Sequence, residues 1–506
     1  MIKENFVLSR VVVFLITVAA MAQSGPEPRL WGGLARGPFN VGFGVVHLTD
    51  PSRYYGAEAK RPIQVSLWYP VQESAQPLGM PFSEYVALYQ RLRTGRNGEL
   101  STTDRTDILA AYGKETFPGS PPAAVAQLLA TPTAAVQDAR PAEGRFPLVV
   151  YAPGLGGTPL THTPVAEYLA SHGYVVAMSP SQGDSPAGMP FDLAGQEQQI
   201  RDIEFTIGAL REQPNVDPWQ IGLVGFSFGG GAVILSGMRI PGIRAVAVLD
   251  GTGGWDATLW LLREAPGFHP AAFRAPLLVL AGDDEVAQDL SLIHSLKCSD
   301  RQVIRIRAMR HHDFIASPLI SAVVTGNVAE SAARGFPFTA QTLLRFFDGH
   351  LQGVRSDMEK AFKLPPEGAA RPGEPSSQIT LPRIAAPSGD ELVTSVLEKG
   401  DIDSLTAAQA AFARKAPGMP LLSEGTMRML ALWFLDHGKK DKAVTALQLL
   451  VDYYPRDVQM LNMLGDLYLE RHEEAKAEQC FRASLAALPG NGGAKDGLKK
   501  LERIGH

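Results

Sequence analysis

A single serine stands among glycines in the stretch IGLVGFSFGGGAVIL, residues 221–235. Gly225 and Gly229 flank Ser227 at two positions on either side, after an apolar run that predicts a buried strand and before a helix predicted over Ala232–Met238. A serine on such a strand-to-helix turn is typical of a nucleophile, because its hydroxyl projects out of the sheet and the helix N-terminus favours negative charge. The motif alone leaves open a glycine-rich turn with an incidental serine.

A serine hydroxyl is a weak nucleophile unless a base takes its proton, so a histidine must reach Ser227. In enzymes with this motif the acid and then the histidine follow the serine along the chain. Of the 11 histidines, only the neighbours His311 and His312, in MRHHDF, directly follow the last strand-like run of the sequence, residues 302–309. The sequence therefore predicts that one of this pair is the base, and surface histidines in a polar loop are the alternative.

The negative charge that develops on an attacked carbonyl oxygen needs backbone N–H groups aimed at it. Phe228, the residue after the nucleophile, is one predicted donor. The second is expected from the glycine-rich loop APGLGGT, residues 152–158, in which Leu155 is the predicted donor. The same loop could instead cradle a phosphate, but it lacks the lysine and the spacing of such loops.

Two places along the chain could supply the acid. Asp250 ends one strand-like run, and the acidic cluster that includes Asp284 and Glu285 ends the next. Because the carboxyl ends of parallel strands meet at one edge of a sheet, either place can face the same histidine. Spacing leaves the choice between Asp250 and the later carboxylates open.

Eight strand-like runs must position these residues. They are residues 41–48, 62–70, 147–154, 174–179, 221–227, 243–250, 276–282 and 302–309. The later runs are short, mostly apolar and separated by helix-length intervals, which predicts a mostly parallel sheet covered by helices on both faces. A serine after the fifth of eight strands is the arrangement of an α/β hydrolase. Residues 71–145 interrupt this pattern and are expected to form a cap-like insertion.

Five stretches together resemble the platelet-activating-factor acetylhydrolase family, neighbours of the dienelactone hydrolases, over about residues 37–351. They are SLWYP, YAPGLGGTPLTHTPVAEYLASHGYVVAMSPSQGD, GFSFGG, AVAVLDG and RHHDF. The resemblance implies an α/β-hydrolase domain in which Ser227 is the nucleophile, His311 rather than His312 the base, and Asp250 the acid. It also implies that Leu155 and Phe228 donate to the oxyanion.

The chain departs from that family's pattern in two places. Pro153 stands where the family usually has a histidine before Gly-Leu-Gly, a change at the mouth of the site that removes no catalytic role. The acidic run GDDE, residues 282–285, is the second departure, and it keeps Asp284 and Glu285 as alternatives to Asp250.

The composition is that of an ordinary soluble globular protein, with 506 residues, 45% hydrophobic and 20% charged. A net charge of −5 gives no electrostatic reason to expect nucleic-acid binding. Two cysteines that stand far apart exclude a disulfide framework, and no Cys-rich or His-rich ligand pattern predicts a metal site.

The first 22 residues have the pattern of a secretory signal peptide. Lys3 and Arg10 precede the apolar stretch Val11–Ala22, which ends in a small-x-small cleavage site. Twelve apolar residues are too few to span a bilayer, which takes about 20. The mature chain is therefore expected to begin near Gln23, to carry no transmembrane anchor and to be periplasmic or secreted.

A separate helical domain is predicted after the hydrolase domain of residues 23–363. Six prolines in residues 364–389 predict a linker, and everything beyond it has a helical pattern. A repeat of 34 residues relates Ala443 to Ala477 and Pro455 to Pro489, in the order of the tetratricopeptide pattern. Residues 390–506 are therefore expected to form a tetratricopeptide-like domain that could bind a protein partner.

These features predict an exported serine hydrolase that cleaves carboxylic esters through Ser227, His311 and Asp250 and needs no cofactor. Acetyl phospholipids, short-chain esters and polyesters are all compatible substrates. A serine peptidase or amidase of the same fold is one alternative, although such relatives usually carry a propeller domain. Another is a catalytically spent scaffold that binds a partner through its helical repeats, against which the intact set of site residues argues.

Overall fold

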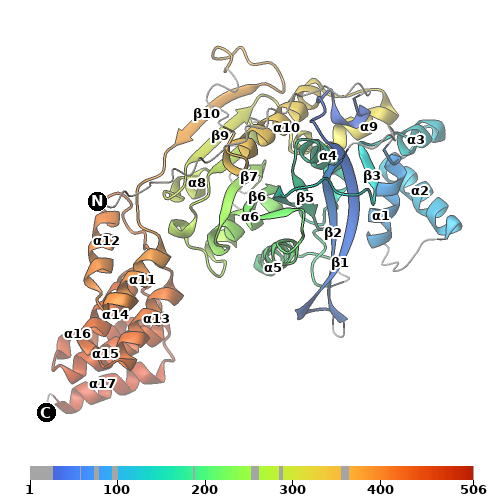
Figure 1. Cartoon of the computed structure of the whole chain (residues 1–506). Helices are drawn as coiled ribbons and strands as arrows, with labels where there is room; N and C mark the ends of the chain where they lie inside the picture. Colours follow the sequence, from blue (N-terminus) through green and yellow to red (C-terminus); the bar gives the residue numbers. More distant parts are fainter. Residues whose placement is uncertain are drawn as a thin grey trace, which may run out of the picture.

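The computed structural model describes residues 27–56, 59–72, 79–93, 101–185, 188–251, 261–283, 289–354 and 364–504. A sheet with helices on its faces makes up the larger part of the molecule, and a group of helices follows it at the C-terminal end (Figure 1). The predicted signal peptide, residues 1–22, lies outside the described residues, and so do Asp284 and Glu285. Within the described ranges, no helix is both long and apolar enough to cross a membrane.

Ten strands of the described chain form one sheet in the order β10-β9-β8-β7-β6-β4-β5-β2-β1-β3. They are β1 (Asn40–Tyr55), β2 (Ala59–Val71), β3 (Ala135–Gln137), β4 (Phe146–Ala152), β5 (Val175–Met178), β6 (Val216–Phe226), β7 (Ile243–Leu249), β8 (Leu277–Gly282), β9 (Arg301–Ile306) and β10 (Pro375–Leu381). The six central strands from β5 to β9 in this order are parallel, whereas β2 is antiparallel to both β5 and β1. The eight predicted strands are all present, and the predicted α/β-hydrolase fold is confirmed, with β3 and β10 added at the two edges of the sheet.

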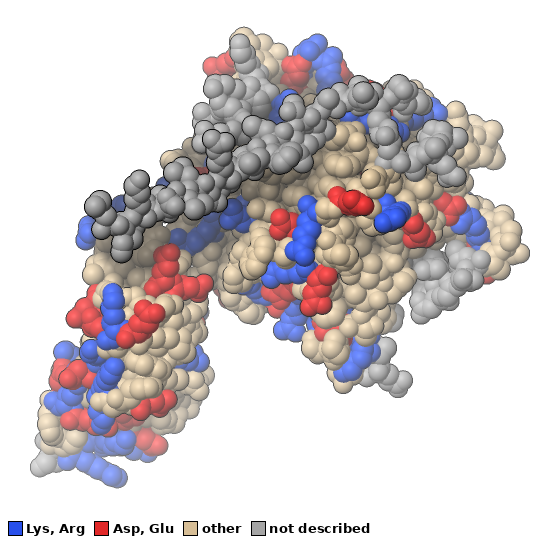
Figure 2. Space-filling model, in the orientation of Figure 1, with Lys and Arg blue, Asp and Glu red and all other residues tan. Residues whose placement is uncertain are grey.

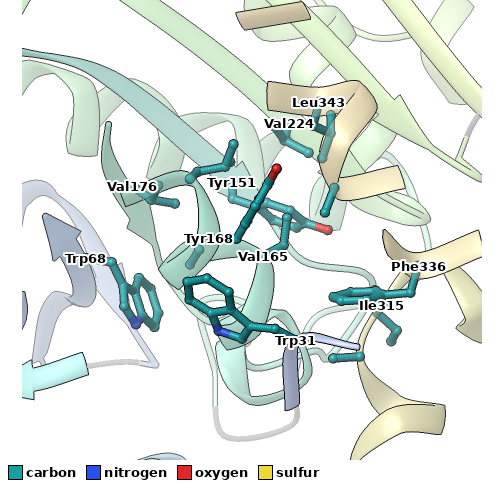
Figure 3. Packing of buried hydrophobic residues seen from close by; sticks show 14 of the residues in the cluster. Trp31, Trp68, Tyr151, Val165, Tyr168, Val176, Val224, Ile315, Phe336 and Leu343 are labelled. Atoms are coloured by element: carbon teal, nitrogen blue, oxygen red, sulfur yellow. The ribbon is translucent and has the colours of Figure 1, made fainter. Parts of the chain in front are cut away.

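Helices cover both faces of the sheet, as its apolar strands require. One face packs against α4 (Thr163–Ser171) and α10 (Glu330–Leu351), the other against α5 (Leu193–Leu210), α6 (Phe228–Arg239) and α8 (Ser291–Ser295). Side chains alternate along β4, because Val149 and Tyr151 belong to the first core and Leu148 and Val150 to the second. Figure 3 shows the first core, in which Tyr151 and Val224 of the sheet lie near Tyr168 of α4 and Leu343 of α10.

The insertion of residues 71–145 joins the first core. Its described elements are α1 (Phe82–Arg93), α2 (Thr102–Thr116), α3 (Pro122–Leu129) and the edge strand β3. Phe82, Tyr85 and Tyr89 of α1 are fully buried in that core. The insertion is therefore a built-in part of the domain, and it contacts two short elements beside the sheet, η2 (Pro159–His162) and α9 (Ser317–Thr325).

A buried carboxylate ties the insertion to the sheet. Glu167 of α4 accepts hydrogen bonds from Trp31 Nε1 at 2.9 Å, from Tyr85 Oη at 2.8 Å and from the Ala134 N–H at 3.2 Å. Burial raises the pKa of Glu167, although the three donors partly compensate by lowering it. Because buried polar groups without partners are costly, this cluster fixes where α1 and the residues before β3 lie.

The predicted linker is wrong over residues 375–381, which form β10. This strand pairs antiparallel with β9 and extends the hydrolase sheet. Seven described helices follow it, namely α11 (Gly389–Lys399), α12 (Asp403–Ala413), α13 (Glu424–Asp436), α14 (Lys440–Tyr453), α15 (Val458–Glu470), α16 (Glu474–Ala487) and α17 (Gly492–Ile504). The hydrolase domain thus ends after β10 rather than at residue 363.

The C-terminal helices pack in sequential pairs, with α13 against α14 and α15 against α16. Gly465 lets α15 approach α16, since a Cβ at this position would lie 2.7 Å from a ring carbon of Phe481. The tetratricopeptide assignment and a protein partner for these helices stay predictions. On the face drawn in Figure 2, basic and acidic side chains are interspersed over these helices rather than gathered by sign.

The helical domain and the hydrolase domain share buried contacts. Ala271 and Cys298 of the hydrolase domain pack into the apolar core of the helices. His269 Nε2 lies 3.1 Å from the Leu421 carbonyl oxygen, and Arg274 donates to the Ala386 carbonyl oxygen at 2.9 Å. The segment after β10 is therefore attached to the hydrolase surface.

Two shortened chains measure what β10 contributes. A chain that ends at Pro387 keeps β10, whereas one that ends at residue 363 leaves β9 as an unpaired edge strand. Both lack the helical domain, so the difference isolates residues 364–387. We expect the thermal midpoint of the shorter chain, measured by circular dichroism, to be lower by about 5 °C or more. Each kcal/mol lost from the free energy of unfolding lowers this midpoint by about 2–4 °C. Equal midpoints would show that β10 adds no stability.

Candidate active site

The turn that carries Ser227 has the strained geometry expected of the motif. β6 ends at Phe226 and α6 begins at Phe228, and Ser227 between them has φ 55° and ψ −124°. A positive φ is uncommon for a residue with a side chain and is retained only where the surroundings enforce it. A Cβ on Gly225 would lie 2.2 Å from the carbonyl oxygen of Gly229, and one on Gly229 would lie equally close to a carbonyl oxygen of β4. Both glycines are therefore required by the close approach of strand, turn and helix.

His311 lies between the two other predicted members of the site. Its Nε2 is 2.9 Å from Ser227 Oγ, and its Nδ1 is 2.6 Å from Asp250 Oδ2. A neutral imidazole fits both contacts if it donates Nδ1–H to the carboxylate and accepts the serine proton at Nε2. The His311 side chain is 28% exposed and that of Asp250 is 12% exposed, so both are partly buried.

Two neighbours hold the His311 ring in place. The ring of Phe226, the residue before the serine, stacks on it with centroids 4.6 Å apart and planes at 28°. His311 begins a short turn, η4 (His311–Phe314), in which Asp313 Oδ2 accepts from the Arg310 N–H at 3.0 Å and from Ser331 Oγ at 2.8 Å. Neither Phe226 nor Asp313 carries a sequence signal for this role, because packing between distant elements leaves no local pattern.

Asp250 follows β7 directly. Its Oδ1 lies 3.3 Å from the Gly282 N–H at the end of β8, while its Oδ2 faces His311. Asp283, the described carboxylate of the acidic cluster after β8, instead accepts from the Ala308 N–H at 2.7 Å. The structure thus brings Asp250 to His311, and Asp284 and Glu285 lie outside the described residues.

His312 is exposed, and its ring lies edge-on to that of His311 with centroids 5.5 Å apart. Of the predicted pair, therefore, His311 is the one that the structure places against Ser227.

The two predicted oxyanion donors flank Ser227. Phe228 is the first residue of α6, so its N–H has no acceptor within the helix. The loop after β4 approaches from the other side, because a Cβ on Gly154 would lie 3.1 Å from Ser227 Cβ. Leu155 sits on a turn closed by the Gly157 N–H, which donates to the Gly154 carbonyl oxygen at 2.9 Å. Neither the Leu155 nor the Phe228 N–H donates a hydrogen bond within the described part of the chain.

Two apolar side chains lie exposed beside these donors. Leu155 is 41% exposed, and Phe191 is 52% exposed with its ring centroid 5.6 Å from that of Phe228. Phe191 was not predicted from the sequence, because a lone phenylalanine in a loop carries no periodic signal. The mouth of the site is therefore partly apolar.

Behind the site, the buried His162 of η2 contacts Tyr151 Oη through Nδ1 at 3.0 Å. Burial lowers the pKa of His162 to about 3, which keeps the ring neutral at ordinary pH. Its ring centroid is 5.6 Å from that of Phe226, on which His311 stacks. No group of three or more His, Cys, Asp or Glu side chains that could hold a metal ion occurs among the described residues.

The chain is similar to one known protein family over part of its length. Residues 134–297 match the dienelactone hydrolase family. The matched segment includes Ser227, Asp250, Leu155 and Phe228, whereas His311 follows it. The more specific resemblance to platelet-activating-factor acetylhydrolases stays a prediction.

A curated relative and a solved structure are also similar to this chain. A putative carboxymethylenebutenolidase of Synechocystis sp. is 32% identical over 127 residues, which cover 22% of this chain and 51% of that protein. The chain thus spans about half the length of this relative. The solved structure of a ferulic acid esterase from Streptomyces cinnamoneus is 22% identical to this chain and superposes with a TM-score of 0.47. The match covers 68% of this chain and 96% of the esterase chain.

Proposed function

We propose that the protein is a serine hydrolase of carboxylic esters. The observation that carries this proposal is the hydrogen-bonded series from Ser227 Oγ through His311 to Asp250 Oδ2 on a strained strand-to-helix turn. The match to the dienelactone hydrolase family and the name of the Synechocystis relative support an ester or lactone as the bond that is cleaved. The apolar mouth at Leu155 and Phe191 favours an apolar ester.

The reaction follows from the positions of these groups. His311 Nε2 takes the proton of Ser227 as Oγ attacks the acyl carbon, and the Leu155 and Phe228 N–H groups stabilise the negative oxygen. Asp250 holds His311 in the tautomer that accepts this proton and stabilises the imidazolium that forms. His311 then protonates the departing alcohol. A water molecule, deprotonated by His311, releases the acid from Ser227.

Parallel assays of the purified protein test this function. We expect hydrolysis of p-nitrophenyl acetate and little hydrolysis of peptide p-nitroanilides. The reverse preference would favour the peptidase alternative, and no turnover of either class would favour a scaffold without catalysis.

We also propose that the protein is exported, which rests on Lys3, Arg10 and the apolar stretch Val11–Ala22. N-terminal sequencing of the protein purified from its own cells tests this. A mature chain that begins near Gln23 supports export, and one that retains Met1 contradicts it.

A further inference from the structure

A cavity of about 200 Å³ lies between the insertion and the catalytic part of the domain. One side is formed by Tyr89 of α1 together with Tyr112 and Phe117 at the end of α2. The other side is formed by η2 and the residue before it, and by α9, which supplies Ile320 and Ser321. The predicted cap-like insertion thus contributes one wall of this partly open cavity.

Both elements of the cavity's second wall lie close along the chain to segments that carry proposed catalytic residues. Thr158, which lines it, stands three positions after Leu155 of the oxyanion loop, and α9 follows the turn that begins at His311. The Ala316 N–H donates to the Thr161 carbonyl oxygen at 2.9 Å, so η2 and the start of α9 are joined. One ring, that of Phe226, separates His162 of η2 from His311.

The lining selects an uncharged group. Of the eleven described residues that line the cavity, five are aromatic or aliphatic and six are Ser, Thr or Gln, so none carries a charge. A carboxylate or phosphate would therefore lose its hydration without gaining a partner of opposite charge. Tyr112, one of the aromatic residues of the lining, is 4% exposed.

We propose that this cavity binds the acyl chain of the ester, with room for about four to seven carbon atoms. The size follows from the 200 Å³ volume, at about 30 Å³ for each water-sized group. We expect the acyl chain rather than the alcohol to enter the cavity. The acyl carbon carries both the chain and the oxygen that the loop of Leu155 holds. That loop continues directly into Thr158 and η2, which line the cavity. This inference rests on the proposed esterase function and specifies its substrate.

A series of p-nitrophenyl esters from acetyl to decanoyl tests the cavity. Each methylene that enters an apolar site contributes about 0.8 kcal/mol, so kcat/KM should rise about fourfold per methylene until the cavity is full. We expect the rise to stop between butanoyl and heptanoyl and the decanoyl ester to fall below the maximum. The acetyl ester, whose chain is too short to enter, reports on the catalytic residues.

Two substitutions fill the cavity from one wall. Ser317 and Ser321 are half-buried, lie one turn apart on α9 and both line the cavity. We expect Ser321→Phe to lower the ratio of hexanoyl to acetyl kcat/KM by about tenfold or more, because it removes the space that four methylenes would occupy. Ser317→Leu should lower the same ratio from a second position, which keeps the test decisive if one variant fails to fold. Thr325→Phe, on the exposed end of the same helix, is the matched control and should leave the ratio unchanged.

Two outcomes would overturn the inference. A hexanoyl-to-acetyl ratio that is unchanged in both variants would show that the cavity is not used. If that unchanged ratio came with an equal fall in kcat/KM for both esters, it would also show that α9 acts on the catalytic residues instead. A selective loss only in a series of acetates with longer alcohols would assign the cavity to the alcohol. Failure of the unmodified protein to hydrolyse any of these esters, the acetyl ester included, would contradict the proposed function itself.

Discussion

Ser227→Ala is expected to lower kcat for p-nitrophenyl acetate by about 10⁴-fold or more, because removal of the nucleophile of a triad leaves only oxyanion and binding contributions. His311 and Asp250 would remain hydrogen-bonded to each other, and the turn would keep its positive φ with alanine in place of serine. The thermal midpoint should therefore change little. Hydrolysis assays with circular-dichroism melts of the same preparations check both statements.

Ser236→Ala is the matched control. Ser236 lies on α6, nine positions after Ser227, is fully buried, and its hydroxyl has no hydrogen-bond partner among the described residues. Loss of an unpartnered buried hydroxyl should leave kcat unchanged and cost no stability. If Ser227→Ala kept more than about a hundredth of the original kcat, Ser227 would not be the nucleophile.

Asp250→Asn is expected to lower kcat by about 10³- to 10⁴-fold with little change in the thermal midpoint. Asparagine nearly preserves the shape of the side chain but presents a neutral amide to His311 Nδ1, 2.6 Å away in the native chain. It neither stabilises the imidazolium nor selects the tautomer that accepts the serine proton. The loss should therefore appear in kcat more than in KM.

Asp283→Asn supplies the comparison at the end of the next strand. Asp283 accepts from the Ala308 N–H and lies near Arg307, so its replacement alters a loop contact rather than a partner of His311. We expect a loss of about tenfold or less, and the same for Asp284→Asn and Glu285→Gln, which would contribute only a screened charge. A larger loss in any of these three variants than in Asp250→Asn would move the acid to the acidic cluster after β8.

Local patterns in the sequence were enough to predict the central strands and the residues that meet at their carboxyl ends. Ser227 was found from the glycines that its turn requires, and His311 from its position after the last parallel strand. Spacing could not choose between Asp250 and the later carboxylates, because β7 and β8 are neighbours and their carboxyl ends face the same histidine. Only the geometry places Asp250 against Nδ1.

The elements that the sequence analysis missed depend on distant contacts. β3 has three residues, and β10, PSSQITL, is an edge strand with a proline at its first position and many polar side chains, so both lack the apolar run of a central strand. The position of the insertion depends on Glu167, which joins Trp31, Tyr85 and the residues before β3 across more than 30 positions. No window of sequence contains these partners, so the sequence predicted a cap-like insertion but not the contacts that hold it against the sheet.

Labelling with a fluorophosphonate, followed by mass spectrometry of the digested protein, tests whether Ser227 is an activated nucleophile. The reagent forms a covalent bond with a serine that a neighbouring base has activated. We expect one adduct per chain, on the peptide that contains Ser227. This adduct should be absent in Ser227→Ala and form much more slowly in Asp250→Asn. No adduct on the folded protein, or an adduct on a different residue, would contradict this role of Ser227.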